Sequence, residues 1–226
     1  MKVAFISDIH SNLEALNAVL ASIDSLRIER IYCLGDVIGY GSDPNRCLET
    51  IKKRKIPCTI GNHEFAVIHQ ETSGFNIYAA EAIWWTINNI THENLEFIKT
   101  FPERREVVLD GLKILMAHGS PFDPINEYVF PEYPFEKITK TVDANVIVLA
   151  HTHVPFVEHV KGKLIANSGS VGQSRDGDPR ACFLILDTEK LDAKIIRVNY
   201  NIRKAAEKII KAGLPEFLAL RLYTGT

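Results

Sequence analysis

The sequence lacks features that would place it in several large classes of protein. It has no apolar run long enough to span a membrane and no basic segment followed by an apolar stretch near its start. We therefore expect no membrane span and no signal peptide. The formal net charge is only -2, which gives no general attraction to nucleic acid or anionic membranes. The basic run at 52–55 lies at the end of a predicted helix, where cations suit the helix dipole better than they indicate a binding patch.

Cysteine is scarce as well. Cys33, Cys47, Cys58 and Cys182 are the four cysteines, and no two of them have the short spacing of a zinc or redox motif. Most lie among apolar residues. This predicts reduced, buried thiols in a cytoplasmic protein.

The composition is that of an ordinary globular chain. Of the 226 residues, 46% are apolar and 24% are charged, and there is no low-complexity tract or internal repeat. This length predicts one domain over 1–226, with a helical extension over about 201–226. The apolar stretch 214–222 could cover this domain or join a second subunit, so a homo-oligomer is one expectation for it.

Hydrophobic periodicity predicts an α/β protein. In the first half, apolar runs typical of buried strands occur at 2–7, 30–34 and 57–60, and helical spacing follows Ser11 and Asn12, begins again at Pro44, and recurs at 75–89 and 92–100. The second half is mainly strand, at 107–109, 113–117, 146–150, 156–160, 163–166, 182–186 and 194–198, followed by a helix over 201–211. Two packed sheets with helices outside would accommodate both halves.

Five short polar clusters follow predicted strands. They are Asp8 with His10, Asp36, Asn62 with His63, His118, and His151 with His153. Each alone has an ordinary explanation as a turn, a cap or a strand end. Together they offer carboxylate, amide and imidazole ligands without cysteine, a set that suits Mn, Fe, Zn or Co. The sequence therefore predicts one shared metal site.

In their order, these clusters resemble the five motifs of the calcineurin-like metallophosphoesterase superfamily. The matching segments are Asp8/His10, Gly35-Asp36-Val37-Ile38-Gly39-Tyr40-Gly41, Gly61-Asn62-His63-Glu64, His118-Gly119 and His151-Thr152-His153. The segment 167–180 is similar to the bacterial and archaeal branch that includes small phosphodiesterases and relatives of diadenosine tetraphosphatase. The resemblance implies a four-layer α-β-β-α sandwich, in which two facing mixed β-sheets are flanked by helices.

The resemblance also implies roles for individual residues. Asp8, His10 and His153 would hold one divalent metal ion, Asn62, His118 and His151 a second, and Asp36 would bridge them. Mn2+ is the expected metal, with Fe, Zn, Co and Ni as alternatives. Two such ions activate a shared hydroxide that attacks phosphorus in line. His63 would protonate the departing oxygen or hydrogen-bond its developing charge.

Two further residues are candidates for substrate contacts. Asn12 could contact the bound phosphate or simply cap the helix that follows it. Arg175 could bind a phosphate oxygen, or it could be an ordinary surface arginine in a loop.

Two positions depart from the protein serine/threonine phosphatase branch of the family. Gly39 and Tyr40 stand where that branch has an aspartate that orients the catalytic histidine and an arginine that binds phosphate. This favours a small phosphodiester or nucleotide substrate over a phosphoprotein. A phosphomonoesterase or protein phosphatase-like enzyme and a non-catalytic metal-binding scaffold remain as alternatives. Whether Asp43 orients His63 is left open by the sequence.

Overall fold

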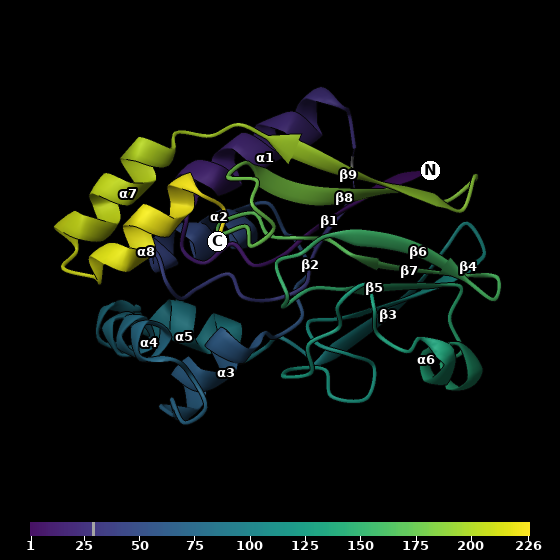
Figure 1. The fold of residues 1–226 in the computed structure, drawn as a ribbon, viewed down its shortest axis with the longest axis horizontal. Helices are drawn as coiled ribbons and strands as arrows, with labels where there is room; N and C mark the ends of the chain where they lie inside the picture. Colours follow the sequence, from purple (N-terminus) through teal and green to yellow (C-terminus); the bar gives the residue numbers. More distant parts are fainter. Residues whose placement is uncertain (29) are drawn as a thin grey trace.

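Two mixed β-sheets form the centre of the protein in a computed structural model that describes residues 1–28 and 30–226 (Figure 1). The first sheet has the order β2-β1-β8-β9 and consists of β1 (Lys2–Ile6), β2 (Arg30–Cys33), β8 (Ala181–Asp187) and β9 (Asp192–Val198). The second has the order β3-β4-β5-β7-β6 and consists of β3 (Arg104–Leu109), β4 (Leu112–Ala117), β5 (Val146–Leu149), β6 (Phe156–Val160) and β7 (Lys163–Asn167). The pairs β1–β2, β4–β5 and β5–β7 are parallel.

Helices connect and cover the strands. They are α1 (Leu13–Ser25), α2 (Pro44–Lys53), α3 (Asn62–His69), α4 (Ile77–Asn89), α5 (His92–Ile98), α6 (Glu136–Thr141), α7 (Ile202–Lys211), α8 (Glu216–Leu220) and the short 3-10 helix η1 (Arg221–Tyr223). Within the described residues, no helix has the length and apolar character needed to cross a membrane. The basic end of α2 is paired with acidic groups, since Lys52 contacts Glu93, and Arg54 lies 2.5 Å from Asp24.

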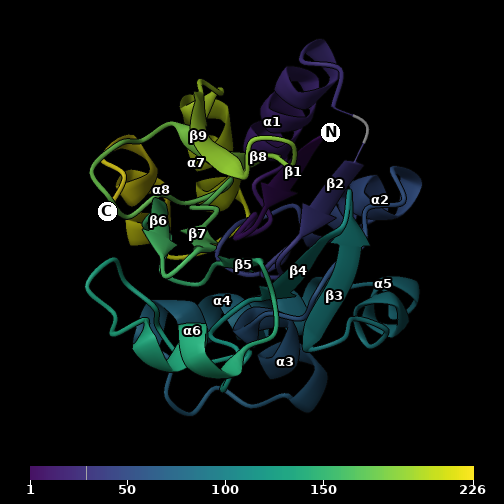
Figure 2. The same cartoon turned by 90° about the vertical axis from the view of Figure 1, so that its right-hand side faces the viewer.

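The predicted four-layer α/β architecture is confirmed. Alternate side chains of a strand face the other sheet and the covering helices. In β1, Val3 and Phe5 pack between the two sheets, whereas Ala4 and Ile6 face the helices. This is the expected result of side chains alternating between the faces of a strand. The outer face of the second sheet packs against Ile138 of α6. Figure 2 shows α1 and α7 outside the first sheet and α6 outside the second.

The strand predicted at 57–60 is wrong. This segment pairs with β2 through a single bridge between Cys33 and Cys58. Pro57 has no N–H to donate to a strand ladder, and the N–H of Ile60 turns away to bond the carbonyl of Pro102 at 2.9 Å. Asn62 and His63 therefore lie on the first turn of α3 and do not follow a strand. Helices α3 and α6 were not predicted.

The helical extension folds back onto the rest of the chain. Leu214, Leu218 and Leu222 are buried in a cluster that includes Tyr40 and two alanines of α4, and Figure 1 shows α7 and α8 at the same end of the molecule as α4. The stretch 214–222 thus covers its own chain. Self-association through this segment stays a prediction, as does the single-domain organisation; size-exclusion chromatography with light scattering tests the former.

Candidate metal centre and cleft

The five predicted clusters come together at one edge of the two sheets. Asp8 follows β1, Asp36 follows β2, His118 follows β4, and both His151 and His153 follow β5. The carboxyl ends of parallel strands lie at the same edge of a sheet, which is where α/β proteins form their ligand sites. The first turn of α3 adds Asn62 and His63.

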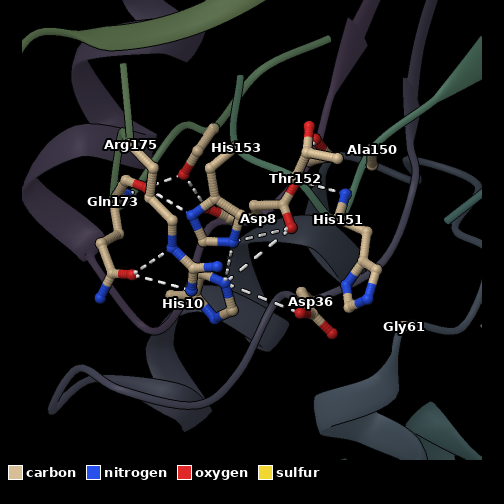
Figure 3. A network of polar contacts seen from close by, with 12 residues as sticks. Asp8, His10, Asp36, Gly61, Ala150, His151, Thr152, His153, Gln173 and Arg175 are labelled. Carbon is tan, nitrogen blue, oxygen red and sulfur yellow. Dashed lines mark hydrogen bonds and ion pairs between the residues drawn. The ribbon is translucent and has the colours of Figure 1, made fainter. Parts of the chain in front are cut away.

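Three of these side chains form one compact group. The Oδ1 atom of Asp8 lies 3.3 Å from Nε2 of His153 and 3.9 Å from Nε2 of His10. The two imidazole nitrogens are 3.0 Å apart. Figure 3 shows all three side chains pointing toward one another. Their ligand atoms are close enough to share one metal ion.

A second group lies beside the first. Nε2 of His118 is 3.1 Å from Oδ1 of Asn62 and 3.1 Å from Nδ1 of His151. Asp36 lies between the two groups, because its Oδ2 atom is 3.4 Å from Nε2 of His118 and 3.6 Å from Nε2 of His10. The structure thus brings together all seven residues predicted as metal ligands.

The outward ring nitrogen of each of the four histidines lies against a backbone carbonyl. In the order His10, His118, His151 and His153, these carbonyls belong to Ile38, Leu34, Asn126 and Gln173. A carbonyl only accepts hydrogen bonds, so the outward nitrogen carries the hydrogen and the ring orientation is fixed. Metal-binding histidines are commonly held in this way.

The inner atoms of the centre fit cations. Burial lowers the pKa of His10 and of His153, so both rings direct nitrogen lone pairs at each other across 3.0 Å. Among the described residues, buried Oδ1 of Asp8 has no hydrogen-bond partner. Lone pairs and a carboxylate oxygen that converge on one point are stabilised by a positive charge between them.

The raised pKa of His118 also shows that positive charge is favoured in this centre. Burial lowers its pKa, but the carboxylates of Asp36 and Asp8 outweigh burial and raise the pKa to about 10. In the metal-free protein, this imidazole therefore holds a proton beside Asp36. A metal ion bound at that place would replace the proton.

The backbone of the centre adopts conformations that side chains disfavour. Asp8, His10, Asp36, His151 and His153 have φ values of 50°, 48°, 52°, 68° and 60°. Left-handed conformations of residues other than glycine cost about 1 to 3 kcal/mol each and persist only where the surrounding structure enforces them. Their concentration in this centre marks it as a preorganised site.

Glu64 is a functional residue that sequence reasoning missed. Its buried carboxylate accepts hydrogen bonds from the backbone N–H groups of Asp36 at 2.8 Å, Gly61 at 2.9 Å and Ile38 at 3.1 Å. Burial, together with the charge of Asp36, raises the pKa of Glu64 to about 7. The side chain ties the Asp36 loop to the start of α3. Its place as the third residue of a helix, where a capping box has glutamate, was the available signal.

Replacing Glu64 by alanine should destabilise the metal-free protein by about 3 kcal/mol or more. The change leaves three backbone N–H groups without their acceptor, and each buried donor left unpaired costs about 1 to 3 kcal/mol. Urea unfolding of chelator-treated protein measures the loss. Glu71→Ala is the matched control, because Glu71 is an exposed glutamate beyond the end of α3. A loss equal to that of the control would contradict this role for Glu64.

His63 is buried beside the centre. Its backbone N–H donates to Oδ1 of Asp36 at 2.9 Å, and its ring contacts the rings of Tyr40 and Phe75, with centroids 4.6 and 5.3 Å away. Burial lowers the pKa of His63 to about 4. Within the part of the chain that the structure describes, its Nδ1 atom has no hydrogen-bond partner.

Gly39 and Asp43, which the sequence indicated as possible neighbours of His63, have different surroundings. A Cβ atom at Gly39 would lie 2.1 Å from Nδ1 of His63, so the absence of a side chain there makes room for the ring. Asp43 accepts a hydrogen bond from Lys208 at 2.6 Å. Aromatic packing therefore takes the place of a carboxylate in holding His63.

A cleft of about 490 Å3 opens onto the centre. It is lined by Asp36, Tyr40, Asn62, His63, Ser73, Gly74, Phe75, Asn76, Asn126, Tyr128, His151, His153, Arg175 and Arg221. The ring of Tyr128 stacks on that of His151, with centroids 3.9 Å apart. Arg175 donates to the hydroxyl of Tyr40 at 3.2 Å, and Figure 3 shows it beside Gln173 and His153. Arg221 was not predicted.

Asn12 does not share this position. Its Oδ1 accepts the N–H of Ala15 at 3.1 Å, and its Nδ2 donates to the carbonyl of Gly172 at 2.9 Å. Both ends of the amide are thus used to cap α1 and to hold a neighbouring loop. The structure shows the helix capping that was one of the two interpretations of Asn12, and a contact of Asn12 with the substrate stays a prediction.

The fold and the group of candidate metal ligands match a family of phosphoester hydrolases. The sequence model for the calcineurin-like phosphoesterase superfamily domain matches residues 1–191, and the chain belongs to this family. It is 42% identical over 240 residues to the uncharacterized protein MJ0912 of Methanocaldococcus jannaschii, covering 99% of this chain and 98% of that protein. It is 27% identical over 192 residues to phosphodiesterase YfcE of Escherichia coli K12, covering 84% and 90%.

Among solved structures, a metallophosphoesterase from Sphaerobacter thermophilus has the same fold along the whole chain. The TM-score is 0.85 at 33% identity, with 100% of this chain and 99% of that chain covered. Family membership and these relatives make the protein a metal-dependent phosphoester hydrolase with a requirement for divalent metal ions.

Proposed function

We propose that the protein is a dinuclear phosphoesterase that hydrolyses a small phosphodiester or nucleotide-type substrate in the cytoplasm. One observation carries the dinuclear assignment: Oδ2 of Asp36 lies between His10 and His118, within 3.6 Å of an imidazole nitrogen of each. In this proposal, Asp8, His10 and His153 bind the first metal ion, Asn62, His118 and His151 bind the second, and Asp36 contacts both.

The proposed metal is Mn2+, with Fe, Zn, Co and Ni as alternatives, because the ligands are oxygen and imidazole nitrogen without thiolate. A bound pair of such ions supplies hydroxide near neutral pH and neutralises charge on the phosphoryl oxygens. The chain itself fixes the ligands in advance. Carbonyl groups set the imidazole orientations, and Glu64 holds the backbone of Asp36.

His63 is the proposed catalytic residue for the leaving group. It lines the cleft next to the ligand Asn62, and its position between Tyr40 and Phe75 is fixed by packing. A pKa of about 4 leaves the ring neutral near pH 7, so its N–H can donate a hydrogen bond to the oxygen that departs from phosphorus. Transfer of a proton to that oxygen would require the imidazolium form of His63.

The substrate assignment rests on the residues around the centre. Gly39 and Tyr40 remove two elements that the protein phosphatase branch uses, and the relative YfcE carries the name phosphodiesterase. Phosphomonoesterase activity is the second candidate, because Arg175 places a guanidinium next to Tyr40, where it can bind a terminal phosphate.

Removal of metal should abolish hydrolysis, and Mn2+ should restore it. The experiment treats the protein with a chelator, adds back each metal in turn, and measures hydrolysis of bis-p-nitrophenyl phosphate and of p-nitrophenyl phosphate. Elemental analysis of the restored protein should give about two ions per chain. A metal-loaded protein that hydrolyses no member of a broad phosphoester panel would favour the non-catalytic scaffold.

A further inference from the structure

Two arginines in the cleft have no aspartate or glutamate partner. Within the described part of the chain, neither Arg175 nor Arg221 pairs with an acidic side chain, although both are partly buried. Two exposed arginines show the contrast, since Arg54 lies 2.5 Å from Asp24, and Arg180 lies 2.6 Å from Asp178. Partly burying the guanidinium of Arg175 without a counter-charge costs free energy, and a bound anion would recover it.

These two guanidinium groups share one surface. The Cζ atom of Arg175 is 5.8 Å from the centre of the Tyr40 ring, and that of Arg221 is 6.0 Å from it. Burial lowers the pKa of Arg221, and the nearby charge of Arg175 lowers it further. Two positive charges that line one cleft beside a metal centre attract a group with more than one negative charge.

Arg221 comes from the part of the chain that lies beyond the family match at 1–191. It is held in place because Leu218 and Leu222 on either side of it are buried, and its Nε donates to an oxygen of Thr226, the last residue of the sequence, at 2.5 Å. The helical extension thus contributes Arg221 to the lining of the cleft.

The loop that carries Arg175 is joined to the same segment. The N–H of Gly177 donates to the carbonyl of Gly225 at 2.9 Å. Gly225 has a φ of 67°, and a Cβ there would lie 2.7 Å from the backbone of Asp178, so the two segments are in close contact. This contact fixes the separation of the two arginines, as a preformed binding site requires.

We propose that Arg175 and Arg221 form a subsite for a second phosphate group of the substrate. This inference rests on the proposed function, in which the metal centre holds the phosphate that is cleaved. Guanidinium groups suit phosphate because they donate several hydrogen bonds in one plane. Substrates with two linked phosphates should then bind better than substrates with one.

The test compares ADP with AMP as inhibitors of bis-p-nitrophenyl phosphate hydrolysis at a fixed concentration of free Mn2+. In the wild-type protein, the Ki of AMP should exceed the Ki of ADP about tenfold or more, as expected for one additional charge-assisted contact. In Arg221→Gln and in Arg175→Gln, this ratio should fall to about twofold or less. Arg203→Gln is the matched control and should keep the wild-type ratio, because Arg203 is an exposed arginine of α7.

A ratio near one in the wild-type protein, or an unchanged ratio in Arg221→Gln, would overturn the subsite. Thermal unfolding of each variant checks that the extension remains folded. If no phosphoester is hydrolysed, isothermal titration of the metal-loaded protein with ADP and with AMP gives the same ratio as dissociation constants. Loss of activity with a preserved ratio would then refute the proposed function and leave the subsite standing.

Discussion

Asp36→Asn is expected to lower kcat by about a thousandfold or more, which corresponds to about 4 kcal/mol of lost transition-state stabilisation. Asparagine has the same shape, and its Oδ1 can still accept the N–H of His63, as Asp36 does at 2.9 Å. The position of Oδ2 between His10 and His118 becomes an amide nitrogen, which carries no charge and does not bind metal. Steady-state kinetics with Mn2+ measure the effect.

Elemental analysis distinguishes the cause of this loss. If Asp36 contacts both ions, the variant should retain at most one ion per chain. Asp24→Asn serves as the control, because Asp24 is an exposed aspartate that pairs with Arg54 far from the five clusters. A variant that keeps two ions and wild-type kcat would refute the bridging role. If the variant loses metal but the wild-type protein itself hydrolyses no substrate, the result would instead support a non-catalytic scaffold.

His63→Asn should lower kcat by about a hundredfold to ten-thousandfold, the usual contribution of a residue that assists proton transfer. The loss should depend on the leaving group. Departure of an alkoxide requires help from a donor, whereas p-nitrophenolate departs easily without it. The measurement is kcat of wild type and variant for a series of phosphodiesters whose leaving groups differ in pKa.

The metal content of this variant should equal that of the wild type, since His63 is not one of the proposed ligands. His69→Asn is the control on the same helix, because its side chain is exposed. Equal losses for good and poor leaving groups would show that His63 acts on the position of other groups. A loss of metal would place it among the ligands, a role that its proximity to His10 and Asp36 allows sterically.

Parts of the fold with a strong local pattern were predictable. The strands β1 and β5 and the helix α1 have hydrophobic periodicity that tertiary contacts reinforce. The segment 57–60 has the composition of a strand, yet Pro57 and the turn at Ile60 limit it to one bridge. The α3 helix begins within the motif that was predicted to follow a strand. Its first turn is held by Glu64, which accepts hydrogen bonds from the backbone N–H groups of Asp36 and Ile38, far away in the sequence.

The residues of the site also differ in how well the sequence predicted them. Asp8 and His153 are far apart in the chain, and the order of the motifs was enough to predict that they belong together. For Arg175, binding of a phosphate oxygen was one of two alternatives that the sequence left open. No local pattern indicated a site role for Arg221, because arginine side chains usually keep their charged end in solvent. Its position in the cleft depends on the packing of Leu218 and Leu222.

The sequence by itself determined the class of protein and the seven side chains that meet at its centre, because the motifs that carry them occur in the order of the family, and six of the seven follow strands with a strong local pattern. Only the tertiary structure decided how these groups are arranged. It set the left-handed backbone that orients them, the hydrogen bonds by which Glu64 holds the Asp36 loop, and the positions of Arg175 and Arg221 in the cleft. The physical reason is that these features are made by contacts between distant segments. Their free energy comes from burial and from hydrogen bonds that local sequence does not encode.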